Sequence, residues 1–230
     1  MTESERRALL EQAKDFFRSR IAANHVKNTQ KLRDVSMFNV NPFIHKYLAQ
    51  FAFGDSSPEN MAKALLYPRI LGTSISTTFG TQLQYFCSEV LTSYASVVTG
   101  IDIEFIDCTD GRRKYCQVKA GPNTVNKDDI KTIVDHFSGI RNLARTNRLD
   151  VRTSDCIVGV FYGTEAELSS SYKQIDQHYP VYIGADFWHR LTGEPRFYYD
   201  LIDAFMEVAD EMNSSALVES LTQQLAQSFI

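Results

Sequence analysis

Two short stretches of alternating apolar and polar residues, joined by an Asp-Gly turn, constrain the fold of this chain more than any other feature. The first runs from Gly100 to Ile106 and the second from Lys114 to Ala120, with the turn at residues 109–112 between them. Alternation of period two predicts β-strands, and Asp-Gly between two such runs is a strong hairpin signal. The sequence therefore predicts an antiparallel pair of strands near the middle of the chain.

Polar residues interrupt both predicted strands. Because side chains alternate between the faces of a strand, Asp102 and Glu104 share one face, as do Gln117 and Lys119 on the other strand. A register that sets these faces side by side gathers a carboxylate, an amide oxygen and an ammonium group. Oxygen ligands suit a hard divalent cation, and a lysine stabilises negative charge that develops on a phosphate. The competing interpretation is an ordinary hairpin with a few polar residues.

Composition narrows the class of protein. A chain of 230 residues with 43% hydrophobic residues can bury a full core. No segment is apolar enough to span a bilayer and residues 1–7 do not resemble a signal peptide, so we expect a cytoplasmic protein without a membrane partner. The cysteines show no Cys-x-x-Cys pair and are expected to be buried free thiols: Cys87, Cys108, Cys116 and Cys156. The histidines show no metal-binding spacing, and none is assigned a catalytic role.

Charge is distributed unevenly along the chain. The net charge is -4, but residues 111–152 contain ten Lys or Arg residues against four Asp residues, whereas residues 194–230 contain one Arg and seven acidic residues. A locally basic surface beside the polar hairpin can bind a polyanion. An ordinary solvated surface is the alternative.

The order of predicted elements favours an α/β fold, with helices covering a mixed sheet. Beyond the hairpin, strands are expected at 156–162 and 180–183, and helices at 4–27, 42–53, 59–66, 81–98, 126–143, 197–212 and 216–229. Asn126 has the position of a helix N-cap. The Gly-, Ser- and Thr-rich segment from Gly72 to Gly80 is expected either to contact phosphates or to be a simple polar loop.

The pattern of Asp102, a variable hairpin and Gln117-x-Lys119 resembles the PD-(D/E)XK nucleases. Here Gly100-Ile101-Asp102 replaces Pro-Asp, and Gln117 replaces the usual acid. The chain also resembles a branch of type II restriction endonucleases that read G·C-rich interrupted palindromes. The segments that carry this second resemblance are Asn41-Pro42-Phe43, residues 68–74, Phe79-Gly80, residues 119–124 and residues 157–163.

This resemblance implies a restriction-endonuclease-like mixed sheet flanked by helices. It divides the chain into a helical N-terminal region (1–66), a nuclease core (67–193) and C-terminal helices (194–230), within one compact domain. It also implies Mg²⁺-dependent cleavage of double-stranded DNA at a short palindrome, GG(A/T)CC or GGNCC with 5′ overhangs. A homodimer and a cognate DNA methyltransferase are expected. The terminal helices that carry Phe16, Phe17, Leu221 and Leu225 are expected either to form part of the dimer interface or to pack within the same subunit.

The resemblance also implies roles for individual residues. Asp102, Gln117 and the backbone carbonyl of Val118 ligate the metal, while Lys119 positions the attacking water and stabilises the phosphate. Further candidates for the metal site are Glu104, Gln84 and Glu89, each with a solvated surface residue as the alternative. For DNA binding we expect two segments, the first with Asn123, Thr124, Asn126 and Lys127, the second with Arg141, Arg145 and Arg148. Arginine can pair with guanine, although phosphate contact is an equal alternative.

Two other functions remain open from the sequence. A structure-specific or repair nuclease could use the same Gln-x-Lys site, and it would cut branched DNA with little sequence preference. A non-catalytic DNA-binding module could retain the nuclease fold, but the presence of both Asp102 and Lys119 argues against it. Metal-dependent cleavage of unmodified duplex DNA into discrete fragments would distinguish a restriction enzyme from both.

Overall fold

The computed structural model describes residues 2–91 and 94–230, without the side chains of Gln84 and Ser88. The chain forms two compact units. The first consists of Met1–Phe16 and Leu83–Phe205, and the second of Phe17–Gln82 and Met206–Ile230. Among the described residues, no helix is both long enough and apolar enough to cross a membrane.

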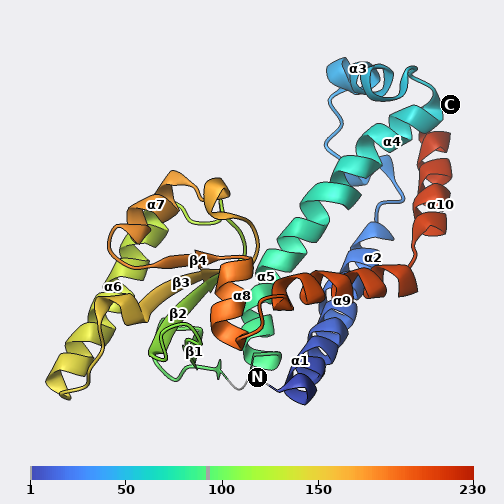
Figure 1. Cartoon of the computed structure of the whole chain (residues 1–230). Coiled ribbons are helices and arrows are strands. Elements are labelled where there is room, and N and C mark those ends of the chain that lie inside the picture. The colour runs from blue at the N-terminus through green and yellow to red at the C-terminus, as the bar shows by residue number, and fades with distance from the viewer. Residues whose placement is uncertain (1, 92–93) are drawn as a thin grey trace. The chain divides into compact units, whose positions relative to one another are not determined.

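The first unit contains a four-stranded mixed sheet (Figure 1). Its strands are β1 (Ile103–Ile106), β2 (Arg113–Lys119), β3 (Cys156–Val160) and β4 (Val181–Ile183), in the order β1-β2-β3-β4. The β1-β2 pair is antiparallel and the other two pairs are parallel. All five residues of β3 are buried, as expected for a continuous apolar strand covered on both faces. The predicted α/β class with a mixed sheet is confirmed.

The predicted hairpin joins β1 and β2. The Asp107 amide donates to the Arg112 carbonyl at 2.9 Å, and the Gly111 amide donates to the Asp107 carbonyl at 2.8 Å. Gly111 has a φ of 70°, a conformation that glycine adopts without strain from a Cβ atom. The turn therefore fixes the register, in which Glu104 lies opposite Tyr115 and Ile103 lies opposite Cys116.

Helices cover both faces of this sheet. On one face, α6 (Lys127–Thr146) and α7 (Ser170–Asp176) form a core with β3 through residues such as Phe137, Val158 and Tyr172. On the other face, α8 (Ala185–Thr192) places Trp188 edge-on against Phe161, with ring centroids 4.9 Å apart. Gly159 leaves room for the adjacent Phe187 ring, since a Cβ there would lie 2.7 Å from two ring atoms. The sheet is thus held between two helical layers.

The remaining helices complete the two units. The first unit also includes α1 (Glu3–Phe16), while the second contains α2 (Ala23–Thr29), α3 (Pro42–Phe53), α4 (Pro58–Pro68) and α10 (Ser215–Ala226). Two long helices, α5 (Ser74–Glu89) and α9 (Phe197–Glu211), contribute residues to both units. Single turns of π-helix occupy Phe17–Ala22 and Arg69–Thr73, and short 3-10 turns lie at Val35–Met37, Thr153–Asp155, Glu165–Glu167 and Gln227–Phe229.

Several sequence expectations need correction. The segment from Gly72 to Gly80 is helical, so the expectation of a polar loop was wrong. The Thr78 hydroxyl bonds to the Ser74 carbonyl one turn earlier, at 2.9 Å, and is thus satisfied within the helix. Helix α5 ends at Glu89 instead of Val98, and α7 and α8 were not predicted. Cys108 is exposed, whereas the other three cysteines are buried free thiols as expected.

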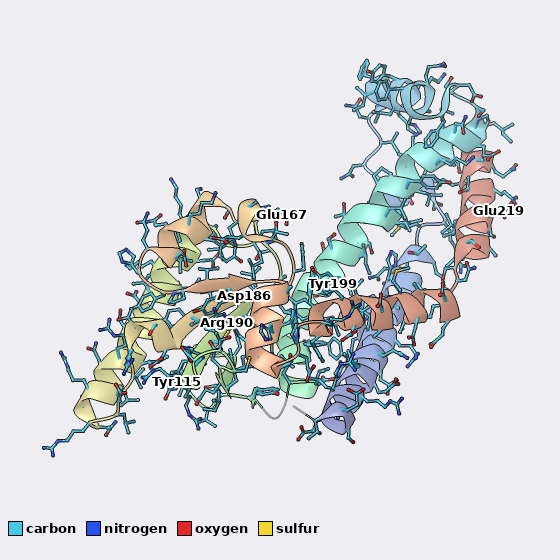
Figure 2. All side chains as sticks on the ribbon, viewed as in Figure 1. Tyr115, Glu167, Asp186, Arg190, Tyr199 and Glu219 are labelled. Carbon is cyan, nitrogen blue, oxygen red and sulfur yellow. The ribbon has the colours of Figure 1, made fainter. Side chains whose placement is uncertain are left out.

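Ion pairs tie the hairpin to its neighbours. Lys114 is 1% exposed, and its ammonium contacts Asp110 at 2.6 Å and Asp155 at 3.4 Å. Arg112 bonds the same Asp155 through two nitrogens, at 2.8 and 2.6 Å. On α8, Arg190 pairs with Asp186 (both labelled in Figure 2) at 3.1 Å, and it also pairs with the buried Asp107 of the turn at 3.0 Å. These contacts tie the turn end of the hairpin to α8 and to the segment before β3.

Candidate active site

Asp102 lies immediately before β1, at the edge of β2. Its backbone amide donates to the Cys116 carbonyl at 3.0 Å, and its Oδ2 accepts the backbone amide of Val118 at 2.7 Å. Burial raises the pKa of the Asp102 carboxyl, and the opposing effects of the Val118 amide and of the nearby Lys119 and His136 do not cancel it. The second carboxylate oxygen, Oδ1, is left as the atom that can bind a cation.

Gln117 and Lys119 lie on the face of β2 that the register places beside the Asp102–Glu104 face of β1. Gln117 is 6% exposed, and its Nε2 donates to the Gly100 carbonyl at 2.6 Å and lies 2.8 Å from His136 Nδ1. Lys119 ends the strand and is half-buried, with no ion pair to any described residue. Its ammonium group is near enough to Asp102 to offset part of the rise that burial causes in the pKa of that carboxyl. The hairpin therefore brings carboxylate, amide and ammonium together.

The oxygen donors at this place fit a hard divalent cation. Within a β-strand the amide and carbonyl of one residue point to the same side, so the Val118 carbonyl faces the same edge of β2 as the amide that bonds Asp102. One carboxylate oxygen, one amide oxygen and one backbone carbonyl are the ligand types that Mg²⁺ accepts. No group of three His, Cys, Asp or Glu side chains that could hold a metal occurs among the described residues. Of the three donors at this place, only Asp102 is a side chain of one of these types.

The other candidates for the metal site have different surroundings. Glu104 accepts the Ser96 hydroxyl at 2.7 Å and the Arg113 guanidinium at 3.1 Å, so both its oxygens serve the structure. Glu89 is exposed at the last residue of α5. The side chain of Gln84 lies outside the described part of the chain. Cys87 is near Asp102, but burial raises the pKa of its thiol to about 12 and keeps it protonated.

Two residues of this site were missed by sequence reasoning. His136, which had been assigned no role, projects from α6 onto Gln117, and Gly100 supplies the carbonyl that Gln117 bonds. The helix after β2 must return along the strand to reach β3, which runs parallel to β2. This crossover places the middle of α6 over the sheet, and it was the one signal that could have located His136 beside Gln117.

The family model for the type II restriction endonuclease EcoO109I matches residues 11–213 of the chain. The chain belongs to this family. No curated protein matches the chain. Membership makes the chain a type II restriction endonuclease, an enzyme that hydrolyses double-stranded DNA site-specifically. The matched range contains the whole hairpin and α6, so the cluster around Asp102 lies inside the part of the chain that defines the family.

In this endonuclease, the first predicted DNA-binding segment forms the loop between β2 and α6. Asn123 is exposed in the loop, and Lys127 is exposed as the first residue of α6. Thr124 donates its hydroxyl to the Gly121 carbonyl at 2.9 Å and lies 3.0 Å from the Tyr172 hydroxyl. Asn126 caps α6 by accepting the amides of residues 128 and 129, as its N-cap pattern predicted. All four residues are exposed, and the side chains of Thr124 and Asn126 also hold the loop and the start of α6.

The second segment lies toward the far end of α6. Arg141 and Arg145 are exposed and line one shallow hollow with Asn142 and Leu149. Arg148 is exposed just beyond the helix, at a φ of 56°. At a rise of about 1.5 Å per residue, Arg145 is roughly 27 Å along the helix from Lys127. The structure does not bring the two segments together, so they can reach DNA only at separate places.

The basic balance of residues 111–152 overstates the charge available to DNA. Arg112 pairs with Asp150 and Asp155, and the buried Lys114 pairs with Asp110 and Asp155. Two of these acids, Asp110 and Asp155, lie just outside that range of the sequence. The cations that remain on the surface of this part of the endonuclease include Lys127, Lys131 and the three arginines of α6 and its end.

Proposed function

We propose that this restriction endonuclease cuts both strands of a short G·C-rich palindrome, GG(A/T)CC or GGNCC, with Mg²⁺ and with 5′ overhangs. The observation that carries the proposal is the convergence of Asp102, Gln117 and Lys119 at the end of the β1-β2 hairpin. The site sequence and the overhang follow from the resemblance of the chain to enzymes that read interrupted palindromes. We also propose a cytoplasmic location and a cognate DNA methyltransferase that protects host DNA.

Asp102 Oδ1, Gln117 Oε1 and the Val118 carbonyl would hold the Mg²⁺ ion. When bound, the ion supplies Lewis-acid stabilisation of the phosphate and makes a bound water more acidic. The Val118 amide fixes the orientation of the Asp102 carboxylate through Oδ2. The Lys119 ammonium positions the attacking water and stabilises the negative charge that develops on the phosphate. These roles require no covalent enzyme intermediate.

Base reading is proposed for Asn123, Lys127 and the exposed arginines Arg141, Arg145 and Arg148. Exposed amide, ammonium and guanidinium groups can bond base edges, and arginine pairs with guanine through two hydrogen bonds. Thr124 and Asn126 contribute by holding the loop and the start of α6, because their side chains already have partners. Phosphate contact is the alternative for each arginine, and the specificity of alanine variants distinguishes the two roles.

The active species is proposed to be a homodimer, because each chain carries one Asp102 cluster and a palindrome has two equivalent strands. The terminal helices expected at the interface are used inside one subunit, with Phe16, Leu221 and Leu225 buried. Helix α3 instead exposes an apolar face in the second unit. Its members are Phe43, Ile44, Tyr47, Leu48 and Phe51, and Phe43 is 92% exposed. Contiguous exposed apolar residues of this kind mark interaction surfaces, and a second copy is the partner that symmetric cleavage requires.

The decisive experiment is digestion of an unmethylated viral genome by the purified protein with Mg²⁺, followed by sequencing of the fragment ends. Discrete fragments with GGNCC-type ends and 5′ overhangs are expected, and none should form with EDTA or with Lys119→Ala. Discrete fragments that end at an unrelated sequence would reject the proposed site but keep the enzyme class. Cleavage of branched DNA alone would replace the proposal with a structure-specific nuclease.

A further inference from the structure

The amide of Gln117 is held in one orientation by two acceptors. Nε2 lies 2.6 Å from the Gly100 carbonyl oxygen, and a carbonyl can only accept a hydrogen bond. The side-chain nitrogen, not the oxygen, must therefore face Gly100. The second hydrogen of Nε2 points to His136 Nδ1 at 2.8 Å, which requires that this ring nitrogen carry no proton. Both hydrogens are used, and Oε1 is left on the opposite side of the amide.

The His136 ring is itself fixed by the backbone of Gly100. Gly100 has a φ of 80°, and a Cβ atom there would lie 2.6 Å from Cγ and 2.7 Å from Cε1 of the ring. The imidazole therefore occupies the space that any side chain at position 100 would need. The backbone of Gly100 thus presents a carbonyl to the Gln117 amide and packs against the ring that holds the same amide.

This arrangement suits an amide better than the acid that commonly stands at this position in the PD-(D/E)XK pattern. A carboxylate at position 117 has no hydrogen to donate, so an anionic oxygen would face the Gly100 carbonyl and the lone pair of His136 Nδ1. Gln117 donates to both acceptors and keeps an oxygen free. The surroundings thus account for glutamine at a position where the common pattern has an acid.

We propose that His136 is a positioning residue of the active site, which orients the Gln117 amide so that Oε1 is presented to Mg²⁺. This inference rests on the proposed function, in which Gln117 is a metal ligand. His136 contacts the ligand and not the metal, an arrangement in which loss of the outer residue weakens metal affinity by about 10–100-fold. This role requires a hydrogen-bond acceptor at the position of His136 Nδ1. Any side chain at position 136 that places an acceptor there should therefore be able to replace histidine.

The test compares His136→Leu, which removes the acceptor, with His136→Asn, whose side-chain oxygen can take the place of Nδ1. We expect His136→Leu to weaken Mg²⁺ binding, measured by isothermal titration calorimetry without DNA, and to raise the Mg²⁺ concentration for half-maximal cleavage by about 10–100-fold. For His136→Asn, both the Mg²⁺ affinity and the Mg²⁺ concentration for half-maximal cleavage should stay within about threefold of the wild type, a small change beside the loss of about 10–100-fold expected for His136→Leu. His178→Leu, an exposed histidine of the same unit, is the matched control and should change neither quantity.

A coupling measurement separates positioning from a general effect on the fold. In a Gln117→Ala background, His136→Leu should have little further effect on Mg²⁺ binding, because the amide that it orients is gone. Unfolding followed by fluorescence of Trp188, the single tryptophan, verifies the fold of each variant. If His136→Leu does not fold, His136→Ala replaces it, since it leaves space instead of strain.

The outcomes are distinct. Equal losses for His136→Leu and His136→Asn, or an undiminished loss in the Gln117→Ala background, would overturn positioning in favour of a purely structural role. Unchanged Mg²⁺ binding in His136→Leu would also overturn the positioning role. The proposed function would still stand in that case if Asp102→Ala and Lys119→Ala abolish cleavage. If those two variants cleave normally, the proposed function itself fails.

Discussion

Replacing Gly100 with alanine tests the geometry on which this site depends. The substitution has two costs in the structure: a non-glycine residue at a φ of 80°, and a Cβ within 2.7 Å of the His136 ring. Left-handed backbone costs about 1–2 kcal/mol for an L-residue, and forcing a methyl group into packed space costs about 1–3 kcal/mol. Gly100→Ala should therefore lower the free energy of unfolding by roughly 2–5 kcal/mol, the sum of both.

A double-mutant cycle separates these costs. In a His136→Ala background the ring is absent, so Gly100→Ala should cost only about 1–2 kcal/mol for the backbone. The coupling between the two positions is then about 1–3 kcal/mol, the packing contribution. Gly111→Ala is the matched control, because Gly111 has a φ of 70° with nothing within 4 Å of an added Cβ. It should show the backbone cost alone.

Urea unfolding followed by Trp188 fluorescence measures these free energies, because Trp188 is fully buried in the unit that contains Gly100 and His136. Cleavage should fall with stability in Gly100→Ala, since a displaced ring releases the Gln117 amide. Additive effects of Gly100→Ala and His136→Ala, with a coupling below about 0.5 kcal/mol, would mean that the ring does not occupy this space. The close approach of His136 to Gly100 would then be refuted.

Four further predictions address the site and its surroundings. Asp102→Ala and Lys119→Ala should each reduce cleavage by about 10²–10³-fold or more while the Trp188 unfolding transition stays cooperative, and near-normal turnover in either would remove that residue from the site. Asp102→Asn should make the metal-free protein more stable at pH 7, because the pKa of Asp102 is raised in the folded state and its ionised form therefore destabilises the fold. The stability of the wild type falls as the pH rises from 3.8 through the raised pKa, so the gain from Asp102→Asn, measured by urea unfolding, should disappear toward low pH. A gain that persists at low pH would contradict the effect of burial on the Asp102 pKa. Arg141→Ala should relax specificity at one base pair by about 1–3 kcal/mol if the arginine reads guanine, or weaken binding to all sequences alike if it contacts phosphate, and unchanged affinity and specificity would exclude it from the DNA interface. Phe43→Asp combined with Phe51→Asp should shift sedimentation from dimer to monomer, and an unchanged dimer would place the interface elsewhere.

Local sequence alone determined the hairpin, the start of α6 and the start of α3. Asp110-Gly111 fixes a turn through bonds within six residues, and Asn126 and Asn41 satisfy free amides of the helices that directly follow them. Because side chains alternate along a strand, the same local pattern also predicted that Gln117 and Lys119 share a face. These features need no information from distant residues, which is why sequence reasoning reached them.

Tertiary structure decided what those residues contact. The partners of Gln117 come from 17 and 19 residues away, and only the return of α6 along β2 brings His136 to it. The Gly72–Gly80 segment is helical although its residues have low helix propensity and none of them is buried. It precedes the part of α5 that carries the buried Leu83 and Phe86, so the helix extends beyond what the local composition predicts. Arginines that seemed to form one basic region with the β2-α6 loop are separated by the length of a rigid helix. Local preference set the pieces of this site, and long-range packing set the orientation of Gln117, on which the proposed metal binding depends.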